Sequence, residues 1–475
     1  MRIRATTICL AGVLLSPIGD LGAQTQQPPS GNVQALGRDI LKELIETNTT
    51  ESAGNVTLAA ERMAARLVAA GFPKSDVQVV GPTDKKRNLV ARFRGRGTRK
   101  PILFLAHLDV VEARREDWSF DPFALTEKDG YFYGRGTIDI KGAGATLVTA
   151  LVRLRQEQWV PDRDLILALT ADEEGGPRNG VEWLLANRRD LIDADYCINF
   201  DSGGPELRGG KVTALDVQAS EKVYASFTLT VKNPGGHSSL PVKDNAIYRL
   251  AAALQRIAAF EFPVVTTEIS RAYFERMAPL SGASGADMRA VAKPAPDAAA
   301  AARLSAKSAF LNAMLRTTCV ATLLQGGHAE NALPQTAQTT VNCRILPAHD
   351  PGEVQKTLEK IVADKEVVIA PVARPTPSPP SPLAPEVLAS METAARATWP
   401  DAVQGSKSVP IVPFMETGAT DGLFLRNAGI PVYGTNGIPY DPDDYRAHGK
   451  DERILVKSFN EGLEFAYQLV KASVR

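Results

Sequence analysis

Five short stretches of this 475-residue sequence carry carboxylates and imidazoles, the side chains that bind divalent cations and transfer protons. The first is the apolar run 101–111, which contains His107 and Asp109. Alternate side chains of a strand face the same way, so the Asp109 carboxylate could accept the ring N–H that a metal-bound His107 must donate. The spacing therefore suits a metal ligand and its supporting acid, and a structural histidine is the alternative.

The other stretches supply four carboxylates and a second imidazole. They are Asp139 in the glycine-rich loop 133–142, Glu173 and Glu174 after a strand expected over 164–170, Asp201 after a strand expected over 195–200, and His448 in the polar stretch 446–452. Each acidic turn by itself could simply be solvated by water. A glycine-rich loop could instead bind phosphate, but the Asp139 carboxylate at the centre of this loop would repel a phosphate group. Because parallel strands deliver their C-terminal residues to one edge of a sheet, we expect the five stretches to meet there.

The elements around these stretches indicate two domains, since 475 residues exceed one compact core. Residues 33–212 and 383–475 alternate strands and helices as in a helix-flanked α/β sheet, mixed but mainly parallel. Residues 213–374 read strand, helix, two strands, helix, strand, which predicts an inserted α+β domain of ferredoxin-like order. An alanine-rich helical insertion occupies 264–316, and the Pro/Ser stretch 375–382 is the expected linker back to the first domain.

The N-terminus predicts a secretory signal over residues 1–23, with a basic start, an apolar run and a small-residue cleavage site. Residues 24–32 form a Gln/Pro/Ser tether. The apolar run is shorter than the ~20 residues that a membrane span needs, so a short anchor is the weaker alternative. We therefore expect an exported mature chain, periplasmic or secreted, with no integral membrane segment.

Composition excludes some partners and argues against a disulfide framework. Lys plus Arg and Asp plus Glu both number 54, so nothing indicates nucleic acid as a partner. Of four cysteines, Cys9 lies in the signal, and the remaining Cys197, Cys319 and Cys343 show no CxxC spacing. Three thiols cannot all pair, and we expect Cys319 and Cys343 to be core residues.

Six motifs in this order resemble the di-zinc metallopeptidase family that contains aminoacylase, carboxypeptidase G and succinyl-diaminopimelate desuccinylase. They are His107-Leu-Asp109, Gly136-Thr-Ile-Asp139-Ile-Lys-Gly142, Glu173-Glu174-Gly-Gly, Asp201-Ser-Gly-Gly, Gly236-His237-Ser-Ser and His448-Gly-Lys-Asp451-Glu452. The match covers about residues 33 to 472. It implies a zinc-peptidase-like catalytic domain with the inserted domain as a lid and dimerisation domain.

The resemblance also implies a role for each residue. Asp139 would bridge two Zn²⁺ ions, or Co²⁺ or Mn²⁺ in their place, and the Asp139–Ile140 peptide would be cis. His107 and Asp201 would complete one site, and Glu174 and His448 the other. Glu173 would be the general base, Asp109 the partner of His107, and His237 of the lid would contact the reacting carbonyl. Where the family often has Asp-Glu-Gly, this chain has Asp201-Ser-Gly.

This scheme gives a plausible hydrolytic reaction. Two cations ~3.5–4 Å apart would lower the pKa of a bridging water to about 7, giving a hydroxide that attacks an amide carbonyl. Glu173 would take the proton and pass it to the leaving amine, and His237 would help to stabilise the oxyanion. A non-catalytic binding protein on the same fold would lack this base. A serine hydrolase is a weaker alternative because no Gly-x-Ser-x-Gly occurs.

The expected substrates are small peptides or N-acyl amino acids cleaved next to a free carboxylate, as by a carboxypeptidase or dipeptidase, with an aminoacylase as the alternative. The predicted substrate contacts are Arg344, Asn331 and Gly418. Arg344 ends an apolar strand, so it either pairs with a protein acid or holds the substrate anion. We expect a homodimer through the lid, and an active monomer is the alternative if the insertion 264–316 replaces the partner surface. His328 and His349 are expected to be structural or surface residues, although His328 is close enough to Asn331 in sequence to line the cleft.

Overall fold

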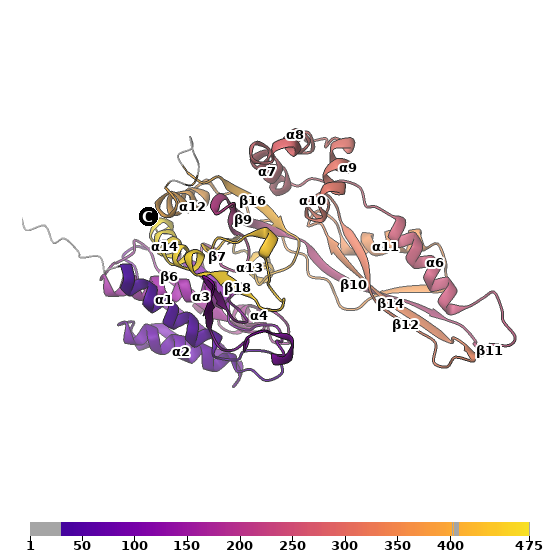
Figure 1. Cartoon of the computed structure of the whole chain (residues 1–475), viewed down its shortest axis with the longest axis horizontal. Helices are drawn as coiled ribbons and strands as arrows, with labels where there is room; N and C mark the ends of the chain where they lie inside the picture. Colours follow the sequence, from indigo (N-terminus) through magenta and orange to yellow (C-terminus); the bar gives the residue numbers. More distant parts are fainter. Residues whose placement is uncertain (1–29, 401, 403–407, 475) are drawn as a thin grey trace, which may run out of the picture.

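The computed structural model describes residues 30–400, 402 and 408–474, which form a larger and a smaller domain (Figure 1). The larger domain is built on a nine-stranded sheet in the order β1-β2-β6-β3-β7-β17-β9-β16, with β8 paired to β9. The strands are β1 Val77–Thr83, β2 Lys86–Phe93, β3 Ile102–His107, β6 Leu165–Thr170, β7 Tyr196–Asn199, β8 Gly204–Arg208, β9 Lys211–Glu221, β16 Ile411–Glu416 and β17 Val432–Gly434. This confirms the predicted mixed sheet.

The central strands of this sheet are parallel, and their alternating side chains enter two cores. β3 pairs in parallel with both β6 and β7, so their C-terminal ends lie at one edge. Along β3, Ile102, Phe104 and Ala106 join one hydrophobic core, while Leu103 and Leu105 join the core on the other face. The unbroken apolar run before His107 therefore follows from burial of the strand on both faces.

Helices cover both faces of the sheet. One face packs against α1 Ser30–Ile45, α2 Val56–Ala69, α3 Lys141–Gln156, α12 Pro385–Thr398 and α14 Val456–Ser473, and the other against α4 Gly180–Asn187, α5 Arg189–Ile192 and α13 Gly422–Asn427. A small sheet of β18 Arg453–Leu455, β5 Tyr131–Tyr133 and β4 Thr126–Lys128 lies beside them. No helix of the described residues is long and apolar enough to cross a membrane.

The smaller domain, here called the lid domain, has the predicted βαββαβ order. Its sheet runs β12-β14-β10-β15 and carries two helices on one face. The elements are β10 Val223–Lys232, α6 Ala246–Ala259, β12 Thr318–Gly326, β14 Thr336–Ile345, α11 Pro351–Val362 and β15 Val367–Pro371. At the end of this domain far from the larger one, β11 Gly236–His237 pairs with β13 Ala332–Leu333 (Figure 1).

The helical insertion lies against the larger domain, which differs from the expectation that it belongs to the lid. It comprises α7 Glu268–Met277, α8 Gly285–Val291, α9 Ala298–Lys307 and α10 Ala309–Leu315. Phe274 and Met314 of this segment share a core with Ala219 of β9 and Val412 of β16. The apolar faces of these helices are therefore buried on the strands at one edge of the large sheet. The expected domain boundary at 212/213 likewise falls inside β9, which belongs to that sheet.

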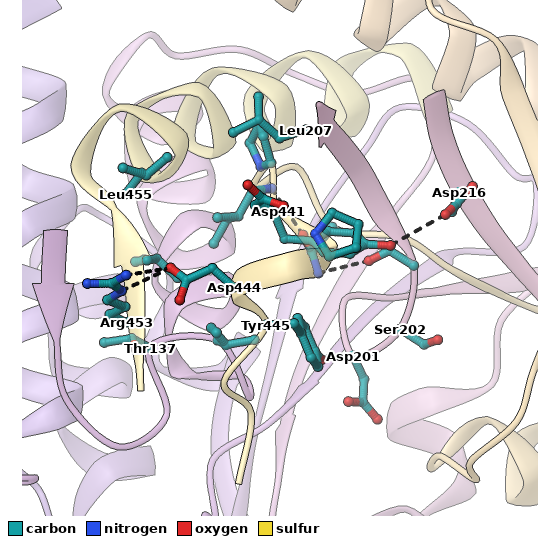
Figure 2. Close-up of a pocket in the computed structure, with 18 of the residues that line it drawn as sticks. Thr137, Asp201, Ser202, Leu207, Asp216, Asp441, Asp444, Tyr445, Arg453 and Leu455 are labelled. Carbon is teal, nitrogen blue, oxygen red and sulfur yellow. Dashed lines mark hydrogen bonds and ion pairs between the residues drawn. The ribbon is translucent and has the colours of Figure 1, made fainter. Parts of the chain in front are cut away.

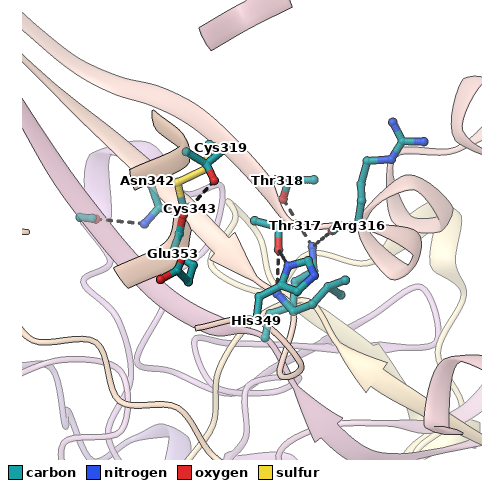
Figure 3. The surroundings of a disulfide bond; sticks show 12 residues. Arg316, Thr317, Thr318, Cys319, Asn342, Cys343, His349 and Glu353 are labelled. Atoms are coloured by element: carbon teal, nitrogen blue, oxygen red, sulfur yellow. Dashed lines mark hydrogen bonds between the residues drawn. A yellow bond between two sulfur atoms is a disulfide. The ribbon is translucent and has the colours of Figure 1, made fainter. Parts of the chain in front are cut away.

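Cys319 and Cys343 form a disulfide, contrary to the prediction that they are plain core residues (Figure 3). They stand directly opposite each other on the antiparallel strands β12 and β14, with Cα atoms 4.0 Å apart. The pairing depends on strand register, which the cysteine spacing along the chain does not reveal. Cys197 is a buried free thiol. The predicted signal and most of the predicted tether, residues 1–29, lie outside the described residues, whereas the last three tether residues, 30–32, belong to helix α1.

Candidate metal centre

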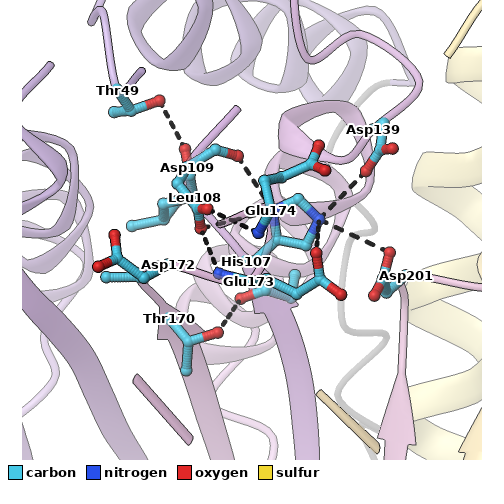
Figure 4. Close-up of polar contacts among 12 residues, drawn as sticks. Thr49, His107, Leu108, Asp109, Asp139, Thr170, Asp172, Glu173, Glu174 and Asp201 are labelled. Carbon is cyan, nitrogen blue, oxygen red and sulfur yellow. Dashed lines mark hydrogen bonds and ion pairs between the residues drawn. The ribbon is translucent and has the colours of Figure 1, made fainter. Parts of the chain in front are cut away.

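Four of the five predicted metal ligands, His107, Asp139, Glu174 and Asp201, meet at the C-terminal edge of the central strands (Figure 4). His107 is the last residue of β3, Glu173 and Glu174 follow β6, and Asp201 follows β7. Parallel pairing of β3 with β6 and β7 brings these three strand ends to one place. Asp139 comes from the loop that opens α3, and its peptide bond to Ile140 is cis, which confirms that prediction.

Asp139 lies between the two imidazoles. Its Oδ1 is 3.1 Å from Nε2 of His107, and its Oδ2 is 3.0 Å from Nε2 of His448. Asp201 Oδ1 lies 3.6 Å from the His107 nitrogen, and Glu174 Oε2 lies 2.9 Å from the His448 nitrogen. The cluster thus divides into a His107–Asp201 half and a His448–Glu174 half that share Asp139. Glu173 sits beside the first half, 4.0 Å from His107 Nε2.

Asp109 supports this arrangement differently from the sequence-based expectation. His107 Nδ1 lies 3.0 Å from the backbone carbonyl of Asp109, whereas the Asp109 carboxylate is 3.7 Å away. That carboxylate accepts hydrogen bonds from the backbone N–H groups of Glu173 and Glu174, at 3.2 and 2.9 Å. One buried aspartate therefore orients the imidazole with its main chain and the two glutamates with its side chain.

The electrostatics of the cluster favour bound cations. No lysine or arginine among the described residues pairs with its four carboxylates, Asp139, Glu173, Glu174 and Asp201. Hydrogen bonds that the His448 ring donates to Asp139 and Glu174 raise the pKa of His448 to about 10. Burial alone would lower the pKa of His107, but Asp139 and Asp201 raise it well above its usual range. The site attracts positive charge, and unpaired buried carboxylates are costly without it.

The donor set also fits divalent metal chemistry. His107, Asp139 and Glu174 place ligand atoms within 4.8 Å of one another, and so do His107, Glu173 and Asp201. Asp201 Oδ2 is buried and has no hydrogen-bond partner among the described residues. Carboxylate oxygens and imidazole nitrogens without thiolates are the ligands of a catalytic site for Zn²⁺ or a similar cation, rather than of a structural zinc.

Burial and the nearby Asp201 carboxylate raise the pKa of Glu173 well above its usual range. Burial would also raise the pKa of Asp139, but hydrogen bonds from His107 and His448 lower it overall. The pKa values of two carboxylates that both lie close to the His107 ring are thus driven in opposite directions. Opposite pKa shifts suit one acid, Asp139, that stays charged as a metal ligand and another, Glu173, that can carry a proton.

Glu452 is a positioning residue, and no role for it was predicted from the motif His448-Gly-Lys-Asp451-Glu452. It is fully buried, and its Oε1 accepts hydrogen bonds from the backbone of Ile138 at 2.7 Å and of Asp139 at 3.1 Å. Its Oε2 pairs with Arg135 at 2.7 Å, and Arg135 donates onward to the carbonyl of His448 at 3.4 Å. The pair therefore joins the two loops that carry Asp139 and His448. The sequence feature that could have revealed this role is the position of Glu452, four residues after the predicted metal ligand His448.

The predicted lid residues lie apart from the cluster. His237 and Asn331 are exposed neighbours at the far end of the lid domain, where the Ser238 N–H donates to the Asn331 carbonyl at 3.0 Å. Arg344 lies at the opposite end of β14, with its guanidinium 4.7 Å from the centre of the Tyr224 ring. No carboxylate of the described residues forms an ion pair with it. Gly418 donates its N–H to Glu416 Oε1 at 3.1 Å.

The two histidines left without a catalytic role also have defined places. His328 is exposed in the turn between β12 and β13, close in sequence to Asn331. His349 Nδ1 lies 2.9 Å from the hydroxyl of Thr317 (Figure 3). Neither contacts the metal cluster.

The fold and the site together define a metal-dependent hydrolase. A sequence profile of Peptidase family M20/M25/M40 matches residues 103–472. The chain is 30% identical over 391 residues to N-fatty-acyl-amino acid synthase/hydrolase PM20D1 of Homo sapiens, an alignment that covers 78% of this chain and 74% of that protein.

Two solved structures share the fold. The M20 family metallo-carboxypeptidase Sso-CP2 from Sulfolobus solfataricus aligns over 92% of this chain and 99% of its own, with a TM-score of 0.67 and 18% identity. The Bacillus subtilis YXEP protein, a dinuclear metal binding peptidase, aligns over 94% of this chain and 99% of its own, with a TM-score of 0.55 and 13% identity. The chain belongs to Peptidase family M20/M25/M40. It is an enzyme for metal-dependent hydrolysis of amide bonds in small peptides or acyl amino acids.

Proposed function

We propose that this enzyme uses two Zn²⁺ ions, or Co²⁺ or Mn²⁺, to cleave an amide bond next to a free carboxylate. The observation that carries the proposal is the position of Asp139, whose two oxygens each contact a different imidazole, at 3.1 and 3.0 Å. His107, Asp139 and Asp201 would hold one cation, and Asp139, Glu174 and His448 the other. When bound, the two cations would polarise the amide carbonyl and lower the pKa of a water to about 7.

Glu173 is the proposed general base. Burial and the nearby Asp201 carboxylate raise its pKa, which makes its carboxylate a stronger base than that of a solvated glutamate, and its backbone N–H donates to the Asp109 carboxylate at 3.2 Å. The Glu173 carboxylate takes a proton from the attacking water and returns it to the amine that leaves. Because Glu173 and Glu174 are adjacent, one backbone segment fixes both the base and a metal ligand.

Arg344 is proposed to bind the carboxylate of the substrate. It has no acidic partner among the described residues, and burial lowers its pKa from the ordinary value, so an anion would stabilise its charged form. The guanidinium rests against Tyr224, which leaves its donors available. Both substrate classes, dipeptides and N-acyl amino acids, carry such a carboxylate. The similarity to PM20D1, named as an N-fatty-acyl-amino acid hydrolase, favours the second class.

A homodimer through the lid domain would complete the site. His237 is exposed at the end of the lid far from the metal cluster of its own chain (Figure 1). The edge strand β12 exposes Val320, Leu323 and Leu324 by 60, 63 and 67%. An edge strand with a row of apolar side chains is a surface that another chain can cover. Such an assembly would let His237 and Asn331 serve the active site of the partner.

Export of the enzyme is part of the proposal. The predicted signal at residues 1–23 is its first support. The second is the Cys319–Cys343 disulfide, because disulfides persist mainly in oxidising compartments. Comparing the N-terminal residue of the protein recovered from the periplasm with that of the cytoplasmic precursor tests this point.

The decisive test of function is a substrate panel. Purified mature protein with added Zn²⁺ is assayed on dipeptides and N-acyl amino acids, each as the free acid and as the C-terminal amide. We expect turnover of free acids, abolished by a chelator and restored by Zn²⁺. Turnover that survives exhaustive chelation, or equal rates on acids and amides, would contradict the proposal.

A further inference from the structure

Asp421 carries a buried carboxyl group that has no part in the proposed reaction. It lies in the loop between β16 and α13 and is 2% exposed. No lysine or arginine among the described residues forms an ion pair with it, and its hydrogen-bond donors are two neutral side chains. A buried carboxyl group is costly unless hydrogen bonds compensate it, so these donors indicate its role.

The two donors stand at the two ends of the loop that carries Glu173. The Thr170 hydroxyl donates to Oδ2 of Asp421 at 3.0 Å, and the side-chain amide of Asn179 donates to Oδ1 at 2.5 Å. Thr170 is the last residue of β6, and Asn179 caps α4. Figure 4 shows Thr170 beside Glu173. One carboxyl group therefore joins both ends of the loop 171–179, and we call Asp421, Thr170 and Asn179 the loop clamp.

The loop 171–179 depends on such ties because part of it has little of its own to hold it. Gly175 and Gly176 follow the two glutamates with φ angles of 150° and 116°, and glycine leaves the backbone free to adopt many other conformations. Asn179 also donates to the carbonyl of Asp172, the residue before Glu173, at 3.3 Å. The clamp thus reaches the backbone next to the proposed base.

The side chain of Asp421 serves this loop rather than its own helix. Asp421 is the N-cap residue of α13, where an aspartate usually accepts a hydrogen bond from an N–H group of the first turn. Its side chain forms no such capping bond. Both of its oxygens accept from Thr170 and Asn179 instead. The contact across the sheet edge is therefore made at the expense of a local one.

Asp421 is itself fixed by the preceding residue. The Thr420 N–H and hydroxyl donate to Glu221 at 2.9 and 3.0 Å. Glu221 is 3% exposed, ends β9 and pairs with Arg426 at 2.9 Å. A side chain can hold another loop in place only when its own backbone is held. This buried network gives the clamp a rigid base on the large sheet.

The clamp is separate from the space in which a substrate could lie. A cavity of about 400 Å³, a usual size for a small-molecule site, opens beside Asp201 and Tyr445 (Figure 2). Asp421, Thr170 and Asn179 do not belong to its wall. A substitution in the clamp therefore leaves this wall unchanged, and its effect should fall on kcat rather than on KM.

We propose that Asp421 is a positioning residue that acts through Thr170 and Asn179 to hold Glu173 where it can take a proton from the attacking water. The inference rests on the proposed role of Glu173 as the general base. A catalytic group misplaced by about 1 Å can cost ~10²-fold in rate, so a loosened loop would slow the proton transfer without removing the base.

The first experiment removes the carboxyl group. With the fastest free-acid substrate of the panel, Asp421→Ala should lower kcat about 10- to 100-fold, with KM within twofold and metal content unchanged. Asp421→Asn should stay within about threefold of wild type, because its carbonyl can accept from Asn179 and its amide can donate to the Thr170 hydroxyl. Unchanged kcat in folded Asp421→Ala would overturn the proposal.

The matched control is Asp76→Ala. Asp76 is also a buried aspartate, 7% exposed, but it pairs with Arg94 at 2.6 Å and precedes the edge strand β1. Its loss should leave kcat within twofold of wild type. Thermal unfolding of each variant reports whether it is folded. An equal fall in kcat for both aspartates would mean that general loss of stability, and not the clamp, slows the enzyme.

The second experiment breaks the clamp from its other side. In Asn179→Ser the serine still caps α4, but its hydroxyl is too short to reach Asp421. It should lower kcat as Asp421→Ala does, and the double variant should lose no more than Asp421→Ala alone, because both changes break one contact. Losses that simply multiply would overturn the proposal. Asn179→Ser also decides the question should Asp421→Ala not fold.

Hydrogen exchange of the metal-free protein tests the clamp without turnover. The N–H groups of Glu173 and Glu174 donate to Asp109, and they should exchange at least tenfold faster in Asp421→Ala but not in Asp76→Ala. Unchanged exchange would overturn the proposal. Faster exchange together with near-full activity of Glu173→Gln would instead contradict the proposed base while leaving the clamp in place.

Discussion

The metal cluster and the far end of the lid domain differ in how completely one chain builds them. In the cluster, the Asp139 carboxylate lies within hydrogen-bonding distance of both His107 and His448. Buried partners such as Glu452, which accepts from the Asp139 N–H, fix this arrangement. At the lid end, His237 is exposed, and among the described residues its ring forms hydrogen bonds with the neighbouring Ser239 alone. Ligands of a metal must be held before it binds, whereas groups that contact only a substrate can arrive by domain closure or from another chain. The predictions below separate these two kinds of site.

The largest effect on activity is expected for substitution of Glu173, the proposed general base. Glu173→Gln should lower kcat by roughly 10² to 10⁴ with metal content unchanged, because the amide can hydrogen-bond but cannot accept a proton. Asp139→Ala should lose metal as well as activity. Metal analysis beside steady-state kinetics distinguishes the two variants, and exposed Glu182→Gln is the control. Near-full activity of Glu173→Gln would show that another group is the base.

The next effect tests whether the lid end acts in another chain. His237→Ala should lower kcat by about 10² to 10³ through loss of an oxyanion contact. If the partner supplies His237, mixing His237→Ala with Glu173→Gln subunits should restore about a quarter of wild-type activity, since half of the dimers are mixed and each has one intact site. Sedimentation at assay concentration measures the dimer. No recovery in dimers shown to be mixed would assign His237 to its own chain.

Arg344 lies between the two regions and should show an intermediate effect. Arg344→Ala should depress kcat/KM on free-acid substrates roughly 30- to 1,000-fold, as expected for loss of a bidentate carboxylate contact. Substrates with an amidated C-terminus should already be poor and should lose little more. Comparable losses on both would mean that the guanidinium does not bind the substrate carboxylate.

The disulfide should affect the stability of the lid domain alone. Closure of the 24-residue separation between Cys319 and Cys343 is worth about 3 kcal/mol, so its removal by double substitution to serine should reduce amide protection in β12 and β14 roughly 100-fold. Protection of β3 and β6 should not change. Hydrogen exchange measures both, and a reductant should alter the wild type but not the double variant. An equal loss in both sheets would mean that the domains unfold as one unit.

The last prediction concerns stability, Asp216 and pH. Its folded pKa of about 8 lies above the unfolded value, so the native state binds the extra proton between about pH 4 and 8. Stability must therefore fall as pH rises through that window, by at most ~1.4 kcal/mol per pH unit, and level off above pH 8. Asp216→Asn should remove this slope. Unfolding in urea at pH 5 and pH 8 measures it, and an unchanged slope would refute the raised pKa.

The sequence by itself determined the central sheet and most of the metal cluster. Apolar runs of strand length ending in His107 or leading into Glu173, Glu174 and Asp201 fix both the burial of the strands and the edge at which these side chains appear. The reason is local, because strand periodicity and two-sided burial are written in consecutive residues. The βαββαβ order of the lid domain followed from the same kind of pattern.

Tertiary structure alone decided features that depend on which segments meet. Register placed Cys319 opposite Cys343, and packing laid the helical insertion on β9 and β16. In the loop after β3, the Asp109 carboxylate accepts hydrogen bonds from the N–H groups of Glu173 and Glu174, and the Asp109 carbonyl lies against the His107 ring. Glu452 gained its role by reaching the loop of Asp139 from more than 300 positions away in the chain. Such contacts depend on how segments far apart in the chain pack against one another, and the spacing of neighbouring residues does not specify that packing.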